Sequence, residues 1–148
     1  MHSSYNKMLL VAAILFLAAC KKDEEPNVVP EITFNGVDKT TIQQFSGPLT
    51  FNIGYKDGDG DLGSNTDGVH NLYIKDRRNN LVYPFRVQNL SPANGEQVSI
   101  QGSLNVEFAP VVLTDSVPSQ SVVFEIYITD RAGHVSNTVN SPQIHITQ

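Results

Sequence analysis

One cysteine and no tryptophan occur among the 148 residues of this chain, so no disulfide within the chain can form. Lysine and arginine number 10 against 15 aspartate and glutamate residues, and they form no basic stripe. This balance argues against a nucleic-acid partner. The sequence contains no Gly-x-Ser-x-Gly elbow, no His-Glu-x-x-His pair and no glycine loop that precedes a helix. We therefore expect a protein that is not an enzyme.

Long apolar runs are also absent. The run Met8–Ala19 has twelve residues, too few to span a hydrocarbon core of about 30 Å. Lys7 gives this run a positive flank, and Leu17–Cys20 fits the lipobox that is read by the bacterial lipoprotein signal peptidase. The sequence therefore predicts a signal peptide over residues 1–19 and a lipid anchor on Cys20.

Residues 20–30 are charged and then punctuated by proline, with almost nothing to bury. This composition predicts a flexible tether between the lipid and a folded domain. The letters Cys-Lys-Lys-Asp-Glu-Glu at Cys20–Glu25 resemble the export signal of Bacteroidota lipoproteins. The resemblance implies attachment to the outer membrane through the lipid on Cys20, with display on the cell surface. The periplasmic face of that membrane is the alternative.

From Glu31 onward, apolar and polar residues alternate with a period of two, which is typical of strands with one face on a core. Leu49–Tyr55 and Val122–Thr129 show the pattern most clearly. Further strand candidates are Ile32–Val37, Asn71–Lys75, Leu81–Val87, Gln97–Phe108 and Val135–Thr147. Gly102 and Pro142 could bend or split the last two, and Pro84 suggests an edge strand.

About seven strands separated by turn signals predict one all-β domain over residues 31–148. The expected architecture is a β-sandwich of immunoglobulin or fibronectin-III type. The cysteine pair and core tryptophan of antibody domains are absent, so only the architecture is predicted. A small closed barrel is the alternative.

The segment Lys56–Gly63 (KDGDGDLG) places Asp57, Asp59 and Asp61 at alternating positions with glycines between them. Such carboxylates repel one another unless a hard cation lies between them, and Ca²⁺ suits an oxygen-rich, flexible loop. The EF-hand pattern does not fit, because Leu62 stands where that loop needs glycine and Gly68 where it needs glutamate. A solvated acidic turn is the alternative interpretation.

Asp130 is a fourth candidate ligand although it lies far along the chain. It follows the predicted strand Val122–Thr129, and the acidic loop follows Leu49–Tyr55. In an immunoglobulin-like sandwich, the loops after these two strands share one end. We therefore expect Asp57, Asp59, Asp61 and Asp130 to converge on calcium, with Asn65 or Asp67 as additional oxygen donors.

Three segments together resemble a group of Bacteroidota lipoproteins with one immunoglobulin-like domain: Tyr55–Gly63, Asn71–Asp76 and Ile126–Asn137. The resemblance covers most of residues 20–147. In that group the aspartate-glycine loop is commonly taken as a calcium-type loop, and by position this carries over to the four aspartates named above. It implies an address and a fold, and little about activity.

The function expected from these features is a lipid-anchored, calcium-stabilised module that binds or scaffolds an unidentified protein or glycan. An accessory subunit of a surface polysaccharide-processing system and a purely structural envelope protein are the alternatives. The basic residues Lys75, Arg77 and Arg78 beside Asp76 are predicted to form a solvated hairpin end, with contact to a carbohydrate or an anion as the alternative.

Overall fold

The computed structural model describes residues 27–92 and 96–148. The predicted signal peptide, Cys20 and the first part of the tether lie outside these described residues. The described part of the chain forms strands and no helix. It therefore contains no helix long and apolar enough to cross a membrane.

Ten strands follow one another along the described chain. They are β1 (Glu31–Val37), β2 (Thr41–Gln43), β3 (Leu49–Asp57), β4 (Leu72–Asp76), β5 (Val82–Phe85), β6 (Ile100–Phe108), β7 (Ser119–Val122), β8 (Phe124–Ile128), β9 (Val139–Asn140) and β10 (Ile144–Thr147).

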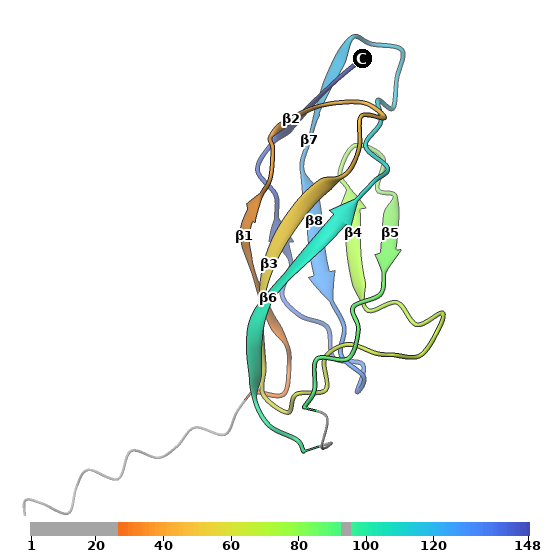
Figure 1. Ribbon diagram of the computed structural model, residues 1–148. Coiled ribbons are helices and arrows are strands. Elements are labelled where there is room, and N and C mark those ends of the chain that lie inside the picture. The colour runs from red at the N-terminus through yellow and green to blue at the C-terminus, as the bar shows by residue number, and fades with distance from the viewer. Residues whose placement is uncertain (1–26, 93–95) are drawn as a thin grey trace, which may run out of the picture.

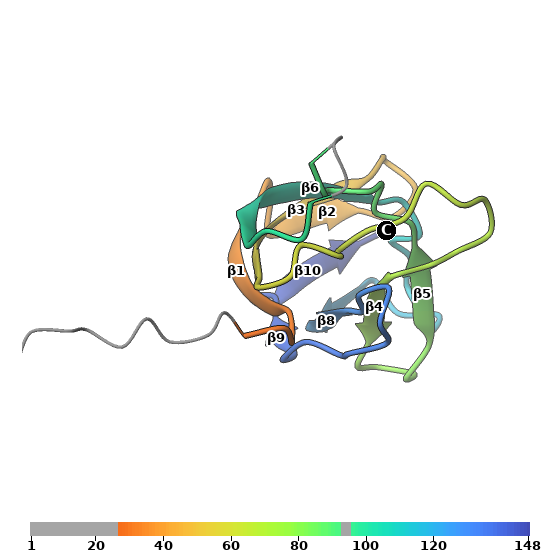
Figure 2. The same ribbon diagram turned by 90° about the horizontal axis from the view of Figure 1, so that it is seen from below.

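These strands form three sheets, with strand orders β1-β3-β6, β5-β4-β8-β9 and β2-β10-β7. The first two sheets face each other as two layers, which is clearest when the molecule is seen along its strands (Figure 2). The third sheet extends the fold toward the C-terminus (Figure 1). The all-β class is thus confirmed, and the arrangement is consistent with a β-sandwich.

The core between the layers follows from the alternating pattern of β3 and β8. Phe51 of β3, Phe108 of β6 and Phe124 of β8 are fully buried. The ring of Phe124 lies 5.7 Å from that of Phe51 and 4.8 Å from that of Phe108, between ring centroids. Aromatic contacts between side chains of both layers therefore hold the sandwich together.

One of the seven predicted strands is divided in the structure where the sequence showed no sign of a break. The run Val122–Thr129 is not one strand: β7 ends at Val122 and pairs with β10, whereas β8 starts at Phe124 and pairs with β4. Val122 and Phe124 are both buried, so the alternation continues across the point where the chain changes partners. Periodicity reports the buried face and not the neighbouring strand, which is why the sequence predicted one strand.

The sequence predicted that Pro142, Pro84 and Gly102 each affect a strand, and the structure confirms the effect of the two prolines. Val135–Thr147 is split, as expected, into β9 and β10 on either side of Pro142. Pro84 lies in β5, at the edge of its sheet, as predicted. Gly102 interrupts nothing, because β6 pairs with β3 without a break from Ile100 to Phe108.

Candidate metal centre

The acidic loop starts where β3 ends, at Asp57, and turns back over the end of the sandwich. Gly60 and Gly63 have φ angles of 70° and 84°, a region that side-chain-bearing residues rarely adopt. A Cβ at either position would also collide with a backbone carbonyl, that of Val98 or that of Gln88. Both positions therefore require glycine, and the glycines give the loop its tight curl.

This curl gathers three carboxylates. One oxygen each of Asp57, Asp59 and Asp61 lies within 4.8 Å of the oxygens of the other two. The Oδ1 atom of each residue is buried and accepts no hydrogen bond from any described residue. Asp57 is fully buried as a whole residue. A buried carboxylate oxygen without a partner is costly, so three of them at one point suit a cation.

The remaining oxygens of the group hold the loop in shape. The backbone N–H of Leu62 donates to Asp57 Oδ2 at 3.1 Å, and that of Ala132 donates to Asp61 Oδ2 at 2.9 Å. The loop therefore uses one oxygen of each of these two residues internally. It leaves the other oxygen of each, Oδ1, buried without a hydrogen-bond donor in the described part of the chain.

The carboxylates of the group carry charges of the same sign and repel one another. Burial raises the pKa of Asp57, and repulsion by Asp59, Asp61 and Asp130 raises it further. Burial also raises the pKa of Asp61, with Asp130 and Asp59 adding to it, while the hydrogen bond from Ala132 and the charge of Arg131 oppose the rise. The folded chain thus holds these carboxylates in a state that favours either a proton or a metal ion.

Asp130 lies beside this group, as the topology of the sandwich leads one to expect. It forms an isolated β-bridge with Leu62, and its charge acts on both Asp57 and Asp61. Its own carboxylate is turned to His134, which donates its backbone N–H to Oδ1, while the ring Nδ1 lies 2.8 Å from Oδ2. This hydrogen bond raises the pKa of His134. The close group of three does not include Asp130.

The two additional donors predicted from the sequence have other partners. Asp67 has a side chain that is 97 % exposed and pairs with Arg86 at 2.5 Å. The close group of carboxylates does not include it either. Asn65 accepts the backbone N–H of Asn89 at 3.1 Å and lines a pocket with Asp59 and Asp61.

Arg131 is a residue of this site that the sequence analysis did not single out. Its Nη1 donates to the carbonyl of Gly63 and to Asn89 Oδ1, and its Nη2 donates to Ser91 Oγ. Its backbone N–H also donates to the carbonyl of Asp61 at 3.4 Å. Arg131 therefore ties three loops together at this end of the molecule. No spacing in the sequence reveals such contacts, because the loops are distant along the chain.

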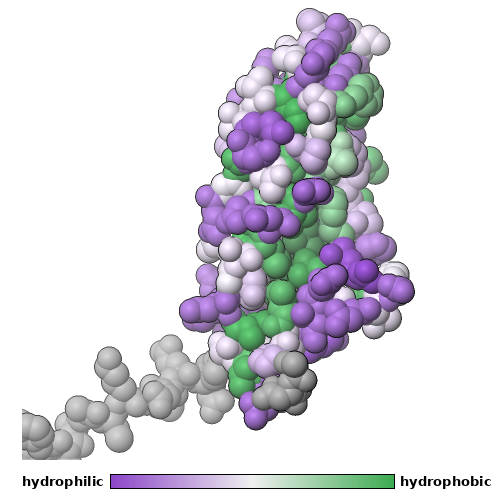
Figure 3. Space-filling view, in the orientation of Figure 1, coloured by the Kyte–Doolittle hydropathy of each residue, from purple (hydrophilic) through white to green (hydrophobic). Residues whose placement is uncertain are grey.

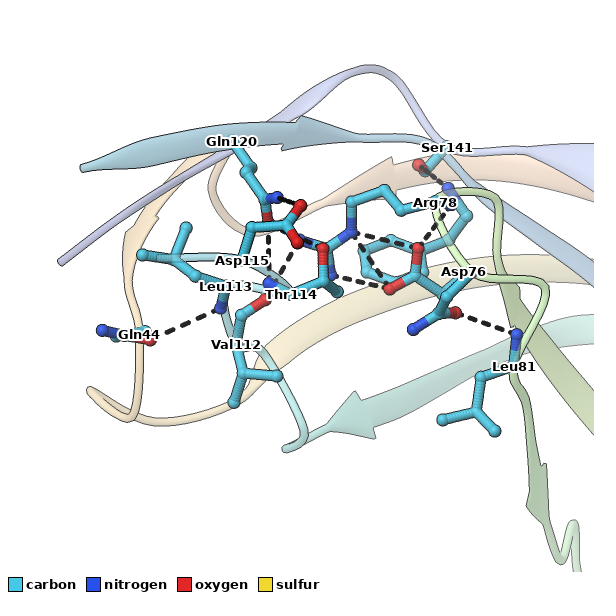
Figure 4. A network of polar contacts seen from close by, with 12 residues as sticks. Gln44, Asp76, Arg78, Leu81, Val112, Leu113, Thr114, Asp115, Gln120 and Ser141 are labelled. Carbon is cyan, nitrogen blue, oxygen red and sulfur yellow. Dashed lines mark hydrogen bonds and ion pairs between the residues drawn. The ribbon is translucent and has the colours of Figure 1, made fainter. Parts of the chain in front are cut away.

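Another buried carboxylate, Asp76, lies at the opposite end of β4 and differs sharply from the group of three. Arg78 donates from Nε to Asp76 Oδ1 and from Nη2 to Oδ2, at 3.1 and 2.7 Å. Its Nη1 also donates to the carbonyl of Val112 and to Gln120 Oε1, both at 3.0 Å (Figure 4). The Arg78 side chain is only 12 % exposed. The prediction of a solvated hairpin end is therefore wrong for Arg78, because its guanidinium is buried and neutralises the carboxylate of Asp76. The side chain of Arg77, by contrast, is 56 % exposed.

Comparison with family models, with curated proteins and with solved structures finds no match to this chain. The site is accordingly defined by its own geometry: three closely grouped aspartates from one loop, with Asp57 buried and Asp59 and Asp61 half-buried, that could hold a metal ion.

Proposed function

We propose that the loop Asp57–Asp61 binds a calcium ion, and that the ion stabilises a lipid-anchored module of the cell envelope. The observation that carries the proposal is the set of three buried Oδ1 atoms without a hydrogen-bond donor, one from each aspartate. Three carboxylates at one point carry a charge that a divalent cation offsets, and this charge is otherwise destabilising.

Calcium is favoured over other divalent ions by the type of ligand. The site offers oxygen and neither sulfur nor nitrogen, whereas zinc prefers cysteine and histidine. Magnesium usually keeps several waters and takes only one or two carboxylates from the protein, whereas calcium accepts six to eight oxygens in flexible geometry. We expect an affinity in the range of ~10⁻⁴ to 10⁻³ M, which is typical of extracellular calcium modules.

The anchor and the address are proposed from the sequence. A lipid on Cys20 would hold the domain at the outer membrane, with the tether as a spacer. Cells fed labelled palmitate should incorporate label into the wild-type protein and none into Cys20→Ser. A binding or scaffolding role at the cell surface is the activity that we propose for such an anchored β-sandwich, in the immunoglobulin-like manner expected from the sequence.

The metal proposal is tested by unfolding the protein with calcium and with a chelator. At about 10 mM calcium, an ion of the expected affinity should add about 1.4–2.7 kcal/mol to the free energy of unfolding. Asp59→Asn removes a charged ligand and should abolish this increase. Asp67→Asn is the matched control, because Asp67 lies in the same loop region but is exposed and paired with Arg86. It should keep the increase in full.

Equal stability of the wild-type protein in calcium and in chelator would overturn the metal proposal. An increase that Asp59→Asn retains would show that calcium binds elsewhere on the protein. Magnesium at the same concentration serves as the ionic-strength control and should stabilise the protein less.

A further inference from the structure

A pocket of about 370 Å³ lies beside the acidic loop. Asp59 and Asp61 line it, together with Asn89, Gln97 and Arg131. Its volume falls within the range of about 300–1,000 Å³ that is typical of small-molecule sites. Two of the three carboxylates of the metal group therefore border the pocket as well. An ion held by the group would lie next to any molecule in the pocket.

The lining of this pocket is almost entirely polar. Among the described residues, Gly60 and Pro92 are the only ones in the lining without a polar side chain. The face shown in Figure 3 is different, because hydrophobic side chains run along its middle between bands of polar ones. The pocket therefore offers hydrogen bonds and a metal site, and little surface on which a hydrophobic ligand could pack.

The acidic loop does not fill the coordination shell of calcium by itself. Its three Oδ1 atoms are fewer than the six to eight oxygens that calcium accepts. The backbone carbonyls of residues 60–63 are directed to neighbouring loops, since each accepts a hydrogen bond from Ser91, Leu90 or Arg131. The remaining coordination positions are therefore left to water or to a ligand that enters from the pocket.

Three amide side chains of the pocket have N–H donors to offer. Asn89 Oδ1 accepts hydrogen bonds from the backbone of Ser91 and from Arg131, and Asn65 Oδ1 accepts one from the backbone of Asn89. The Nδ2 atoms of both asparagines and the side-chain amide of Gln97 form no hydrogen bond with another described residue. An oxygen-rich ligand is the complement of these donors.

The charge of the site favours a neutral ligand over an anion. The three aspartates of the loop and Glu96 contribute four carboxylates, whereas Arg131 and a calcium ion supply three positive charges. At least one negative charge therefore remains when the ion is bound. A phosphate or carboxylate group would add to this charge and be repelled. Hydroxyl groups add no charge, and their oxygens can coordinate the ion and accept hydrogen bonds from amides.

We propose that this pocket binds a neutral saccharide, and that two adjacent hydroxyl groups of one sugar ring complete the coordination of calcium. The proposal rests on the calcium site proposed above and names the class of ligand for the binding role. The side-chain amides of Asn65, Asn89 and Gln97 hydrogen-bond the other hydroxyl groups of the saccharide. Because the described lining has no aromatic ring for a sugar to stack on, binding depends on the ion, and a chelator removes it.

The test is titration calorimetry of the full chain in a detergent without a sugar headgroup. The neutral probes are mannotriose, xylotriose, maltotriose and galactobiose, and digalacturonate is the anionic counterpart of galactobiose. At about 10 mM calcium, the wild-type protein should bind at least one neutral probe. The affinity for that probe should fall at least tenfold in chelator.

Gln97→Ala separates the saccharide from the metal, because Gln97 lines the pocket and does not belong to the carboxylate group. It should weaken saccharide binding about fivefold, as expected for one hydrogen bond, and keep the calcium effect on unfolding in full. Gln101→Ala is the matched control, since Gln101 is an exposed glutamine of β6 outside this pocket. It should bind like the wild-type protein. Asp59→Asn should lose both effects.

A wild-type protein that calcium stabilises but that binds no neutral probe would overturn this proposal and leave the metal proposal intact. Equal binding in calcium and in chelator would also overturn it, because the ion would then take no part. Binding of digalacturonate alone would mean that the ligand is an anion, contrary to the charge of the site. Unfolding that calcium leaves unchanged would overturn the metal site itself, and this proposal with it.

Discussion

The two ends of β4 show two ways in which a small β-sandwich treats buried carboxylates. At the end where β4 finishes, Asp76 is buried and Arg78 from the same hairpin covers both of its oxygens. At the end where β4 begins, Asp57, Asp59 and Asp61 are grouped with one another, and each has a buried oxygen without a donor. One site is neutralised by the chain itself, and the other is not.

The difference shows that the chain supplies a counter-charge for Asp76, whereas no described cationic side chain forms an ion pair with the carboxylates of the acidic loop. Removing a charge from water costs several kcal/mol, and a partner of opposite sign must offset this cost. Arg78 provides that partner at Asp76 and has further acceptors in Val112 and Gln120. At the acidic loop, the charge of Arg131 acts on Asp61, but the hydrogen bonds of its guanidinium go to neutral acceptors on the neighbouring loops. A cation from solution is the remaining way to neutralise the loop.

The largest effect is expected at the neutralised site. Asp76→Asn leaves the guanidinium of Arg78 buried without its counter-charge, which should cost about 3–5 kcal/mol of the free energy of unfolding. Calcium and chelator should give the same loss, because Arg78 replaces any metal ion there. Denaturant unfolding in both conditions measures it. A loss under about 1 kcal/mol would mean that the pair is solvated, contrary to its burial.

The same substitution at the other end should have the opposite sign in chelator. Asp57→Asn removes one of the repelling charges from the loop, so it should raise the free energy of unfolding by about 1 kcal/mol without calcium. With calcium, the variant should gain nothing and fall below the wild-type protein. The measurement is the free energy of unfolding of the wild-type protein and of Asp57→Asn, each with calcium and with chelator. A variant that is less stable than the wild-type protein in chelator would contradict an unneutralised loop.

The smallest effect is expected from pH. Burial and neighbouring carboxylates raise the pKa of Asp57 and Asp61 above the ordinary value of 3.8. The folded chain therefore binds protons more tightly than the unfolded chain does, and this contribution to stability in chelator grows as the pH falls toward the raised pKa values. The pKa of His134 is raised from 6.5 by Asp130, so its stabilising contribution is present below pH 6.5 and is lost as the pH rises through the folded value.

The stabilising contribution of the two aspartates and that of His134 both increase as the pH falls, so one pH series measures them together. In chelator, the difference in stability between the wild-type protein and Asp57→Asn should narrow as the pH falls from 7 to 5. The gain from calcium should shrink over the same range, because protons compete with the ion for the carboxylates. His134→Gln should remove the part of the pH dependence near neutrality. A difference that widens with falling pH would contradict the assigned direction.

Much of the fold could be predicted from the chain alone, because burial on one face of a strand leaves a period of two. Leu49, Phe51 and Ile53 are fully buried as their alternation predicts, and the same holds for Phe124, Ile126 and Ile128. The sequence could not predict the short β2, nor the change of partner at Val123, because neither alters the alternation. Pairing is a property of two strands, and one strand carries little record of it.

In the candidate site too, local features could be predicted from the sequence and contacts between distant loops could not. Asp57, Asp59 and Asp61 could be predicted because aspartate and glycine alternate within one loop, and a local curl needs no distant partner. That Asp130 lies beside them followed from the order of strands in a sandwich. Its turn toward His134, the exposure of Asp67 and the bridging role of Arg131 could not be predicted, because each depends on the side chain that a neighbouring loop presents.

The sequence by itself determined the all-β class and the local group of three carboxylates, since both arise from residues close together along the chain. Tertiary structure alone decided which buried carboxylates found a counter-charge. Asp76 and the acidic triad are equally acidic as letters. The fold buries Arg78 against Asp76, where Val112 and Gln120 also hold its guanidinium, and beside the triad it turns the guanidinium of Arg131 to neutral acceptors.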